Sequence, residues 1–90
     1  MLLLITYDLK QPDRNYNALY DAIKNCGKRW WHYLESVWIV YVENSTPQEC
    51  YNHIHPYMDN NDNLFIVDIT DKDFYGWLPK DAWRWLNDNN

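Results

Sequence analysis

Glycine, cysteine, proline and basic residues are all scarce in this sequence. Two of its 90 residues are glycine, two are cysteine and four are proline, which argues against collagen-like, low-complexity and disulfide-stapled folds. Cys26 and Cys50 fit neither a CxxC motif nor a zinc-ligand spacing, so we expect reduced, partly buried thiols. No apolar stretch approaches the roughly 20 residues of a membrane-spanning helix, and the apolar run at residues 1–5 is too short for a signal-peptide core. The sequence therefore predicts a cytoplasmic protein without a membrane segment.

Acidic residues outnumber basic residues by 13 to 8, which gives a formal net charge of −5. The whole acidic excess lies in residues 46–90, whereas the charges of residues 1–45 balance. A protein that binds duplexes generically needs a basic surface that displaces counterions from phosphates. The composition argues against that class and leaves only local basic positions, at Lys10, Arg14, Lys28 and Arg29.

Apolar and aromatic residues are plentiful, at 47% and 18% of the chain. This composition is typical of a folded domain, and the length fits one domain. We expect a single domain over residues 1–90, with a core at residues 1–70 and a tryptophan-rich C-terminal extension at residues 71–90.

Hydrophobic periodicity predicts strands at residues 2–8, 28–34, 36–43 and 64–70, and helices at residues 15–26, from residue 46 and from residue 79. Strands 2–8 and 36–43 are apolar on both faces, so we expect them at the centre of a sheet. The pattern therefore predicts an α+β, ferredoxin-like βαββαβ fold. Its four-stranded antiparallel sheet has the order 4-1-3-2, with both helices on one face and a short C-terminal helix in addition.

Local signals mark where the two predicted helices begin and end. Gly27 follows the first helix and is expected to supply a left-handed C-terminal cap. Thr46-Pro47-Gln48-Glu49 is a capping box with proline at the first helical position, and Pro56 is expected to kink the second helix or end it early.

The sheet face opposite the two helices has no predicted cover within residues 1–70. A bare aromatic face of this kind usually packs against something, so we expect the terminal segment or a second copy of the chain to cover it. On the last strand, the better-buried set is predicted to be Phe65, Val67 and Ile69. In the terminal helix, Leu78, Ala82, Trp85 and Leu86 share a face that excludes Trp83, and residues 87–90 are expected to fray.

Trp30, Trp31, Trp77 and Trp83 are the candidates for an interface. Tryptophans can fill a thin core and mediate self-association, anchor another protein, or stack on nucleic-acid bases. We favour the first two interpretations, in that order, because the net charge disfavours the third.

Asp8 is the first candidate for chemistry, because it ends a predicted central strand. A carboxylate at such a position can hold a hard cation such as Mg²⁺, and two copies across a dimer axis would supply two ligands. The plainer alternative is that Asp8 caps the turn or pairs with Lys10 or Arg14. Asp68 is expected near Leu3 rather than Asp8, facing solvent or a dimer contact.

His32 is the second candidate, on the predicted edge strand. A histidine titrates near neutrality and can act as a general base, but the sequence offers no partner at a useful spacing, which favours a structural hydrogen bond. His53 and His55 are two residues apart on a helix and face different directions. The sequence lacks a Gly-rich phosphate loop, a Ser-His-Asp set and an HExxH motif.

Three segments resemble the small CRISPR-associated endoribonuclease-like proteins. Leu2-Leu3-Leu4-Ile5-Thr6-Tyr7-Asp8-Leu9 is similar to their first strand, Glu35-Ser36-Val37-Trp38 to their Ser-Val-Phe motif, and Thr46-Pro47-Gln48-Glu49 to the start of their second helix. The resemblance covers residues 1–70, and the related VapD toxins share the fold. The chain looks closest to small bacterial and phage proteins with a "SinR family" label, through Tyr-Asp-Leu, Trp-Trp-His-Tyr and Gly76-Trp77-Leu78-Pro79-Lys80.

The resemblance implies a ferredoxin-like homodimer. In the CRISPR-associated proteins, the aspartate that ends strand one faces its twin across the dimer axis and binds divalent metal for phosphodiester cleavage. Asp8 is the matching position, Mg²⁺ is the implied cofactor, and Arg29 partly matches their basic strand-two residues. Lys10, Arg14, Arg29 and His32 are then the expected contacts to RNA or a nucleotide ligand.

Two functions remain open at this point. The first is a metal-dependent nuclease of the CRISPR-associated or VapD kind. The second is a non-catalytic dimeric module that binds a protein partner or a small nucleotide, in bacterial or phage defence or counter-defence. The acidic charge, the Trp-Trp-His-Tyr segment and the aromatic terminal helix depart from the family pattern and motivate the second.

Overall fold

One antiparallel sheet of four strands organises the protein, in the order β2-β3-β1-β4. The computed structural model describes residues 1–90, and its elements are β1 (Leu2–Asp8), α1 (Asn17–Lys24), β2 (Arg29–Leu34), β3 (Val37–Tyr41), α2 (Pro47–Ile54), the 3-10 helix η1 (His55–Tyr57), β4 (Asn63–Asp68) and α3 (Lys80–Asn89). This order is the predicted one read from the other edge. The ferredoxin-like fold with a C-terminal helix is therefore confirmed.

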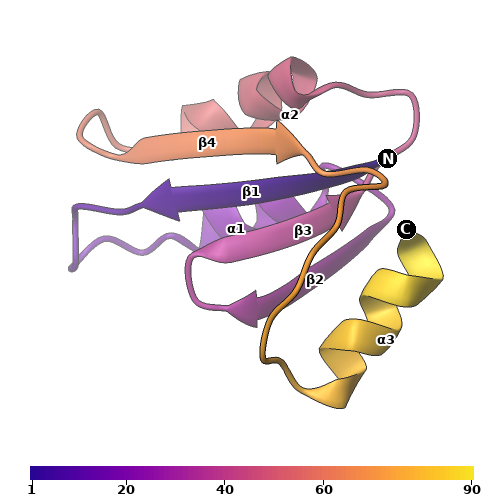
Figure 1. Ribbon diagram of the computed structural model, residues 1–90. Helices are drawn as coiled ribbons and strands as arrows, with labels where there is room; N and C mark the ends of the chain where they lie inside the picture. Colours follow the sequence, from indigo (N-terminus) through magenta and orange to yellow (C-terminus); the bar gives the residue numbers. More distant parts are fainter.

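The main core lies between the sheet and helices α1 and α2, which both lie behind the sheet in Figure 1. Alternate residues of β1 face this layer, and both Leu3 and Ile5 are completely buried. The other members of the core are Tyr16, Leu19, Ile23, Trp38, Val40, Val42, Cys50 and Ile54. The two-sided apolar pattern of β1 and β3 thus places them at the centre of the sheet, as the sequence predicts.

A second core lies on the opposite face of the sheet, beneath α3. It consists of Leu2, Trp31, Ile39, Ala82 and Leu86. The indole Nε1 of Trp31 donates a hydrogen bond of 3.2 Å to the carbonyl of Ala82. In Figure 1, the segment that connects β4 to α3 crosses in front of the sheet, and α3 lies beside β2. The sequence left open whether the C-terminal segment or a second copy of the chain covers this face. The C-terminal segment covers at least part of it.

The predicted buried face of β4 is wrong. Leu64 and Ile66 pack against the main core, whereas the side chain of Phe65 is 64% exposed. Ile66 is paired directly with Ile5 across the antiparallel ladder, and directly paired residues point to the same face of a sheet. Because both alternate sets of β4 are apolar, the sequence did not reveal which set faces the helices.

The N-terminal cap at Thr46 and the early end of α2 are confirmed. The Thr46 hydroxyl accepts a 3.1 Å hydrogen bond from the amide of Glu49, with Pro47 in the first turn. The α-helix ends at Ile54, and a 3-10 turn containing Pro56 follows. Proline has a fixed φ and no amide hydrogen, which suits Pro47 to the first helical turn and Pro56 to the end of the regular helix.

The left-handed cap predicted at Gly27 is wrong, because no glycine in the structure has a positive φ. The helix itself is shorter than predicted and ends at Lys24. A Cβ on Gly27 would lie 2.2 Å from the carbonyl oxygen of Tyr41. Glycine is needed here because the chain passes close to the backbone of β3.

The C-terminal helix packs more completely than predicted. Trp83, expected outside the apolar face, also packs against the second core, together with Leu78 and Trp85. The tail that was expected to fray is helical to Asn89. Asn89 donates a 2.8 Å hydrogen bond to the carbonyl of Trp85, and Asn90 accepts one of 3.2 Å from the amide of Asp71. None of the helices combines the length and the apolar character that crossing a bilayer requires.

Candidate functional site

Asp8 lies at the end of the central strand β1, where β4 begins and the β2–β3 turn passes (Figure 1). In the antiparallel pairing of β1 with β4, Asp8 lies opposite Asn63. The amide of the preceding residue, Tyr7, donates a 3.3 Å hydrogen bond to the carbonyl of Ser36 in the β2–β3 turn. The Asp8 carboxylate is 63% exposed, with Oδ2 2.6 Å from the Nζ of Lys10. Hydrogen bonding to Asp8, and then its charge, raise the pKa of Lys10 above its usual value. The pairing with Lys10 is the plainer alternative that the sequence left open.

One protomer alone does not form a metal site around Asp8. No group of three or more His, Cys, Asp and Glu side chains is arranged to hold a metal ion. Hard cations such as Mg²⁺ take about six oxygen ligands, from carboxylates, phosphates and water. A cation at Asp8 therefore needs ligands from outside the protomer.

Two hollows flank Asp8. The smaller, of about 250 Å³, is lined by Thr6, Tyr7, Asp8, Asn63, Leu64 and Phe65. The larger, of about 580 Å³, is lined by Tyr7, Asp8, Tyr20, His32, Glu35 and Ser36, together with Leu9. The fold thus brings the two candidates for chemistry, Asp8 and His32, to the same hollow. It also adds Tyr20 and Glu35, which sequence reasoning missed.

Trp38 organises the aromatic side chains around the larger hollow. The His32 ring stacks on it with ring centroids 3.7 Å apart and an interplanar angle of 5°. Tyr20 also stacks on Trp38, at 6.1 Å. The Tyr7 hydroxyl accepts a hydrogen bond of 3.1 Å from Trp38 Nε1 and donates one of 3.1 Å to the carbonyl of Glu35. Burial is the largest influence on Tyr7 and raises its pKa, so its hydroxyl stays protonated.

The hydrogen bonds of His32 define its tautomer. Nδ1 lies 3.0 Å from the carbonyl oxygen of Val37. A carbonyl oxygen can only accept, so Nδ1 carries the hydrogen, and Nε2 of the neutral ring is an acceptor. The predicted structural hydrogen bond of His32 is present, and it leaves the second nitrogen available.

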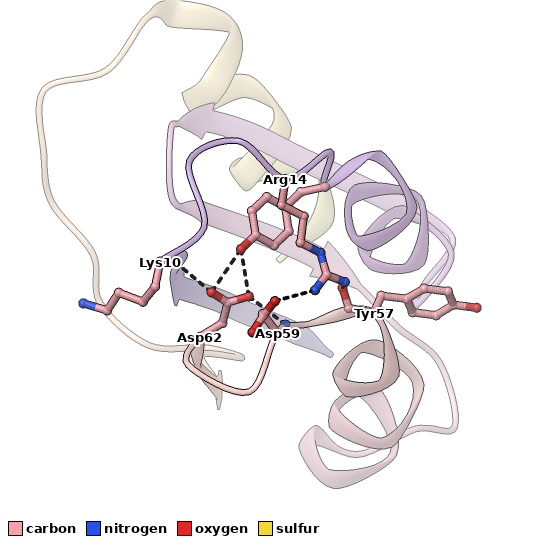
Figure 2. Close-up of polar contacts among 6 residues, drawn as sticks. Lys10, Arg14, Tyr57, Asp59 and Asp62 are labelled. Atoms are coloured by element: carbon pink, nitrogen blue, oxygen red, sulfur yellow. Dashed lines mark hydrogen bonds and ion pairs between the residues drawn. The ribbon is translucent and has the colours of Figure 1, made fainter.

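Arg14 is held in a polar network instead of facing the hollows (Figure 2). Its guanidinium donates hydrogen bonds of 3.1 Å to the Asp59 carboxylate and 2.9 Å to the carbonyl of Tyr57. The network continues through Asp62, which accepts a 2.7 Å hydrogen bond from the amide of Lys10. The ammonium end of Lys10 points away from this cluster in Figure 2.

Arg29 lies at the opposite end of the sheet from Asp8. It is paired with Tyr41, which is paired in turn with Leu2 at the start of β1. Its guanidinium lies 4.3 Å from the centroid of the Tyr41 ring and donates to the side chain of Asn89. The structure therefore brings Lys10 and His32 to Asp8, and it does not bring Arg14 or Arg29 there.

The four candidate interface tryptophans differ widely in exposure. Trp77 is 99% exposed and Trp30 is 44% exposed, with Lys24 over the ring of Trp30 at 4.9 Å. Trp31 is only 2% exposed because it lies in the second core, and Trp83 is half-buried against that core. Within one protomer, Trp77 and Trp30 thus retain the surface that an interface requires.

The remaining candidates are engaged locally. Asp68 lies opposite Leu3 on the exposed surface, as predicted, and accepts hydrogen bonds from the amide and hydroxyl of Thr70. Both cysteines are free thiols. The ring of His55 stacks on Tyr51 at 4.9 Å.

Comparison with known proteins identifies the family of the chain. Its sequence matches the family described as CRISPR associated protein Cas2 over residues 1–75. No curated protein matches the sequence. The matched region contains the whole sheet, α1, α2 and Asp8, and it ends before α3. The chain therefore belongs to the CRISPR-associated Cas2 family.

Proposed function

We propose that two copies of this chain form a metal-dependent endoribonuclease, in which the paired Asp8 side chains hold a divalent cation, Mg²⁺. The observation that carries this proposal is the exposed Asp8 carboxylate at the end of the central strand. The family supports a CRISPR-associated, endoribonuclease-like kind of protein. Since no group of three or more ligating side chains forms within one copy of the chain, a second copy would complete the donor set.

The cation would supply Lewis acidity and lower the pKa of water for attack on a phosphodiester. Around it, the residues of this chain bind and orient the RNA. Lys10 Nζ lies at one Asp8 oxygen and carries the charge that contacts a phosphate. His32 lines the same hollow, and its Nε2 is left free by the hydrogen bond of Nδ1 to the carbonyl of Val37.

Asp8→Asn tests this function. Losing the charged metal ligand removes several kcal/mol of transition-state stabilisation, so we expect cleavage of single-stranded RNA with Mg²⁺ to fall by about 100-fold or more. Asp13→Asn is the matched control, because Asp13 is an exposed carboxylate in the loop that follows β1. Chelation of the metal should reproduce the Asp8 defect in the wild-type protein. Equal cleavage by Asp8→Asn and wild type would reject the assignment.

A specific observation favours the second function, a non-catalytic module that binds a protein partner or a small nucleotide. Arg14 and Arg29, two of the four expected contact residues, are occupied by internal partners, and the net charge is −5. Calorimetric titration with nucleotides, together with partner capture, tests this module. No nucleotide binding and no captured partner, together with robust RNA cleavage, would reject the non-catalytic module.

A further inference from the structure

We infer that the larger hollow beside Asp8 is a nucleobase pocket that selects guanine, and that Glu35 reads the base. The inference rests on the proposed function and specifies its substrate as guanine-containing single-stranded RNA. The hollow has a volume of about 580 Å³, within the roughly 300–1,000 Å³ range of small-ligand pockets. It therefore has room for one base with its ribose.

The walls of the hollow suit a flat ligand. Three of the residues that line it, Tyr7, Tyr20 and His32, are aromatic. Aromatic side chains that line a pocket are the usual stacking partners of unpaired bases. His32 is held flat against Trp38, which fixes its plane before any ligand arrives.

Acceptors outnumber donors among the free polar groups on the residues that line the hollow. The Tyr7 hydroxyl already donates to Glu35 and accepts from Trp38, so it is not available. The residues of the hollow also carry the carboxylate of Glu35, the second oxygen of Asp8 and the Nε2 of His32, together with the hydroxyls of Ser36 and Tyr20, which can donate or accept. The ion pairs of the protein do not include Glu35. A ligand that matches this set must donate hydrogen bonds.

Guanine matches the Glu35 carboxylate best among the four RNA bases. Its Watson–Crick edge presents two neighbouring donors, the N1 imino and N2 amino groups, and a carboxylate can accept both in parallel. Adenine and cytosine place a ring acceptor beside their amino donor, and uracil has one imino donor between two carbonyl oxygens. The negative charges of Asp8 and Glu35 also repel phosphate from the hollow, so the base enters and the backbone stays near Lys10.

Nucleoside titrations of the full chain, without added metal, test the pocket. We expect guanosine to shift the NMR signals of the Trp38 indole and the His32 ring, with an affinity about tenfold above that of adenosine, cytidine and uridine. Inosine, which lacks the N2 amino group, should bind with intermediate affinity.

Glu35→Gln should weaken guanosine binding about tenfold and abolish the preference, because an amide presents only one acceptor oxygen. The side chain is exposed, so the variant should fold normally. Glu43→Gln is the matched control, because Glu43 pairs with Lys28 and does not line the hollow. Equal affinities for all nucleosides, no binding at millimolar concentration, or unchanged selectivity of Glu35→Gln would each overturn the inference.

These outcomes are separable from those of the proposed function. Selective guanosine binding by a protein that never cuts RNA with Mg²⁺ would support the pocket and reject the nuclease. RNA cleavage that depends on Asp8, without any base preference in cutting or in binding, would support the nuclease and reject the pocket.

Discussion

Gly27 occupies a position where the protein has no space for a side chain. The next amide, that of Lys28, donates a 2.9 Å hydrogen bond to the carbonyl of Tyr41, which pulls this segment against β3. A Cβ at residue 27 would lie 2.2 Å from that carbonyl oxygen and 2.6 Å from a methyl group of Val40. The atom that blocks it belongs to the backbone of a central strand, so relief requires movement of the sheet itself.

We therefore predict that Gly27→Ala lowers the free energy of unfolding by about 1–3 kcal/mol, the usual cost of overpacking. Urea denaturation followed by tryptophan fluorescence measures the change. Gly76→Ala is the control, because the nearest atoms to its Cβ belong to Trp83 at 3.9 Å, an ordinary contact. It should change stability by no more than about 0.5 kcal/mol. Equal stability of the two variants would contradict the close approach at Gly27.

The position of Asp8 could be predicted from the sequence, but that of Glu35 relative to it could not. Thr6 is the last residue of β1 that pairs with β3, opposite Val37. Extending this antiparallel register by two residues places Tyr7 opposite Ser36 and Asp8 opposite Glu35. The strand that ends at Asp8, and the two strands that flank the turn at Glu35, were identified in the sequence. Their register was not, because a strand that is apolar on both faces keeps its pattern when it slips. The turn chemistry and packing that select one register are properties of the folded protein.

At the scale of elements, one carboxylate joins two connections that are distant in sequence. Asp62 lies in the turn before β4 and accepts hydrogen bonds from the amide of Lys10, the hydroxyl of Tyr16 and the amide of Asp59 (Figure 2). Desolvation acts to raise the pKa of Asp62, but these hydrogen bonds, first that of Lys10, outweigh it and lower the pKa below its usual value. The network holds the β1–α1 connection, and with it the end of β1, against the turn.

A pH dependence follows from this lowered pKa. The ionised Asp62 stabilises the folded state at pH values above the ordinary carboxyl pKa of about 4, and this contribution is lost as the pH falls through the lowered value. We predict that Asp62→Asn lowers the unfolding free energy by about 1 kcal/mol at neutral pH, the usual scale of such hydrogen bonds. The deficit should shrink as the pH falls below the ordinary carboxyl pKa of about 4, in urea titrations across the acid range. Asp73→Asn, at an exposed position before α3, should follow the wild type at every pH. A deficit that stays constant with pH would contradict the role of the charge.

The C-terminal helix shows what a sequence pattern does and does not specify about an element. Its apolar stripe predicted a helix with one buried face, and Ala82 and Leu86 are indeed buried. The stripe is equally compatible with packing on its own sheet or on a second copy. Trp31 favours packing of α3 on its own sheet, because the indole nitrogen donates a hydrogen bond to the carbonyl of Ala82. Such long-range partners, like those of Asn89 and Asn90, leave no local signal in the sequence.

At the scale of the whole molecule, the face that carries α3 still exposes large apolar side chains. Phe65 on β4 is 64% exposed, and Tyr75 and Trp77 in the segment before α3 are completely or almost completely exposed. Exposed aromatic residues of this size are enriched at protein interfaces. The proposed function requires a second copy of the chain, and this surface is the one we assign to it.

We predict that the wild-type protein is a dimer and that Trp77→Ser weakens it. Removing an interface tryptophan typically costs about 2 kcal/mol, which raises the dimer dissociation constant about 30-fold. Sedimentation velocity over a concentration series measures this constant. Tyr51→Ser is the control, because Tyr51 is 40% exposed on α2, across the sheet from α3. Stability of the protomer should not change with Trp77→Ser, since that side chain is 99% exposed. If the wild type sediments as an 11.1 kDa monomer throughout, a cation cannot be shared by two Asp8 side chains, and the nuclease proposal fails with the dimer.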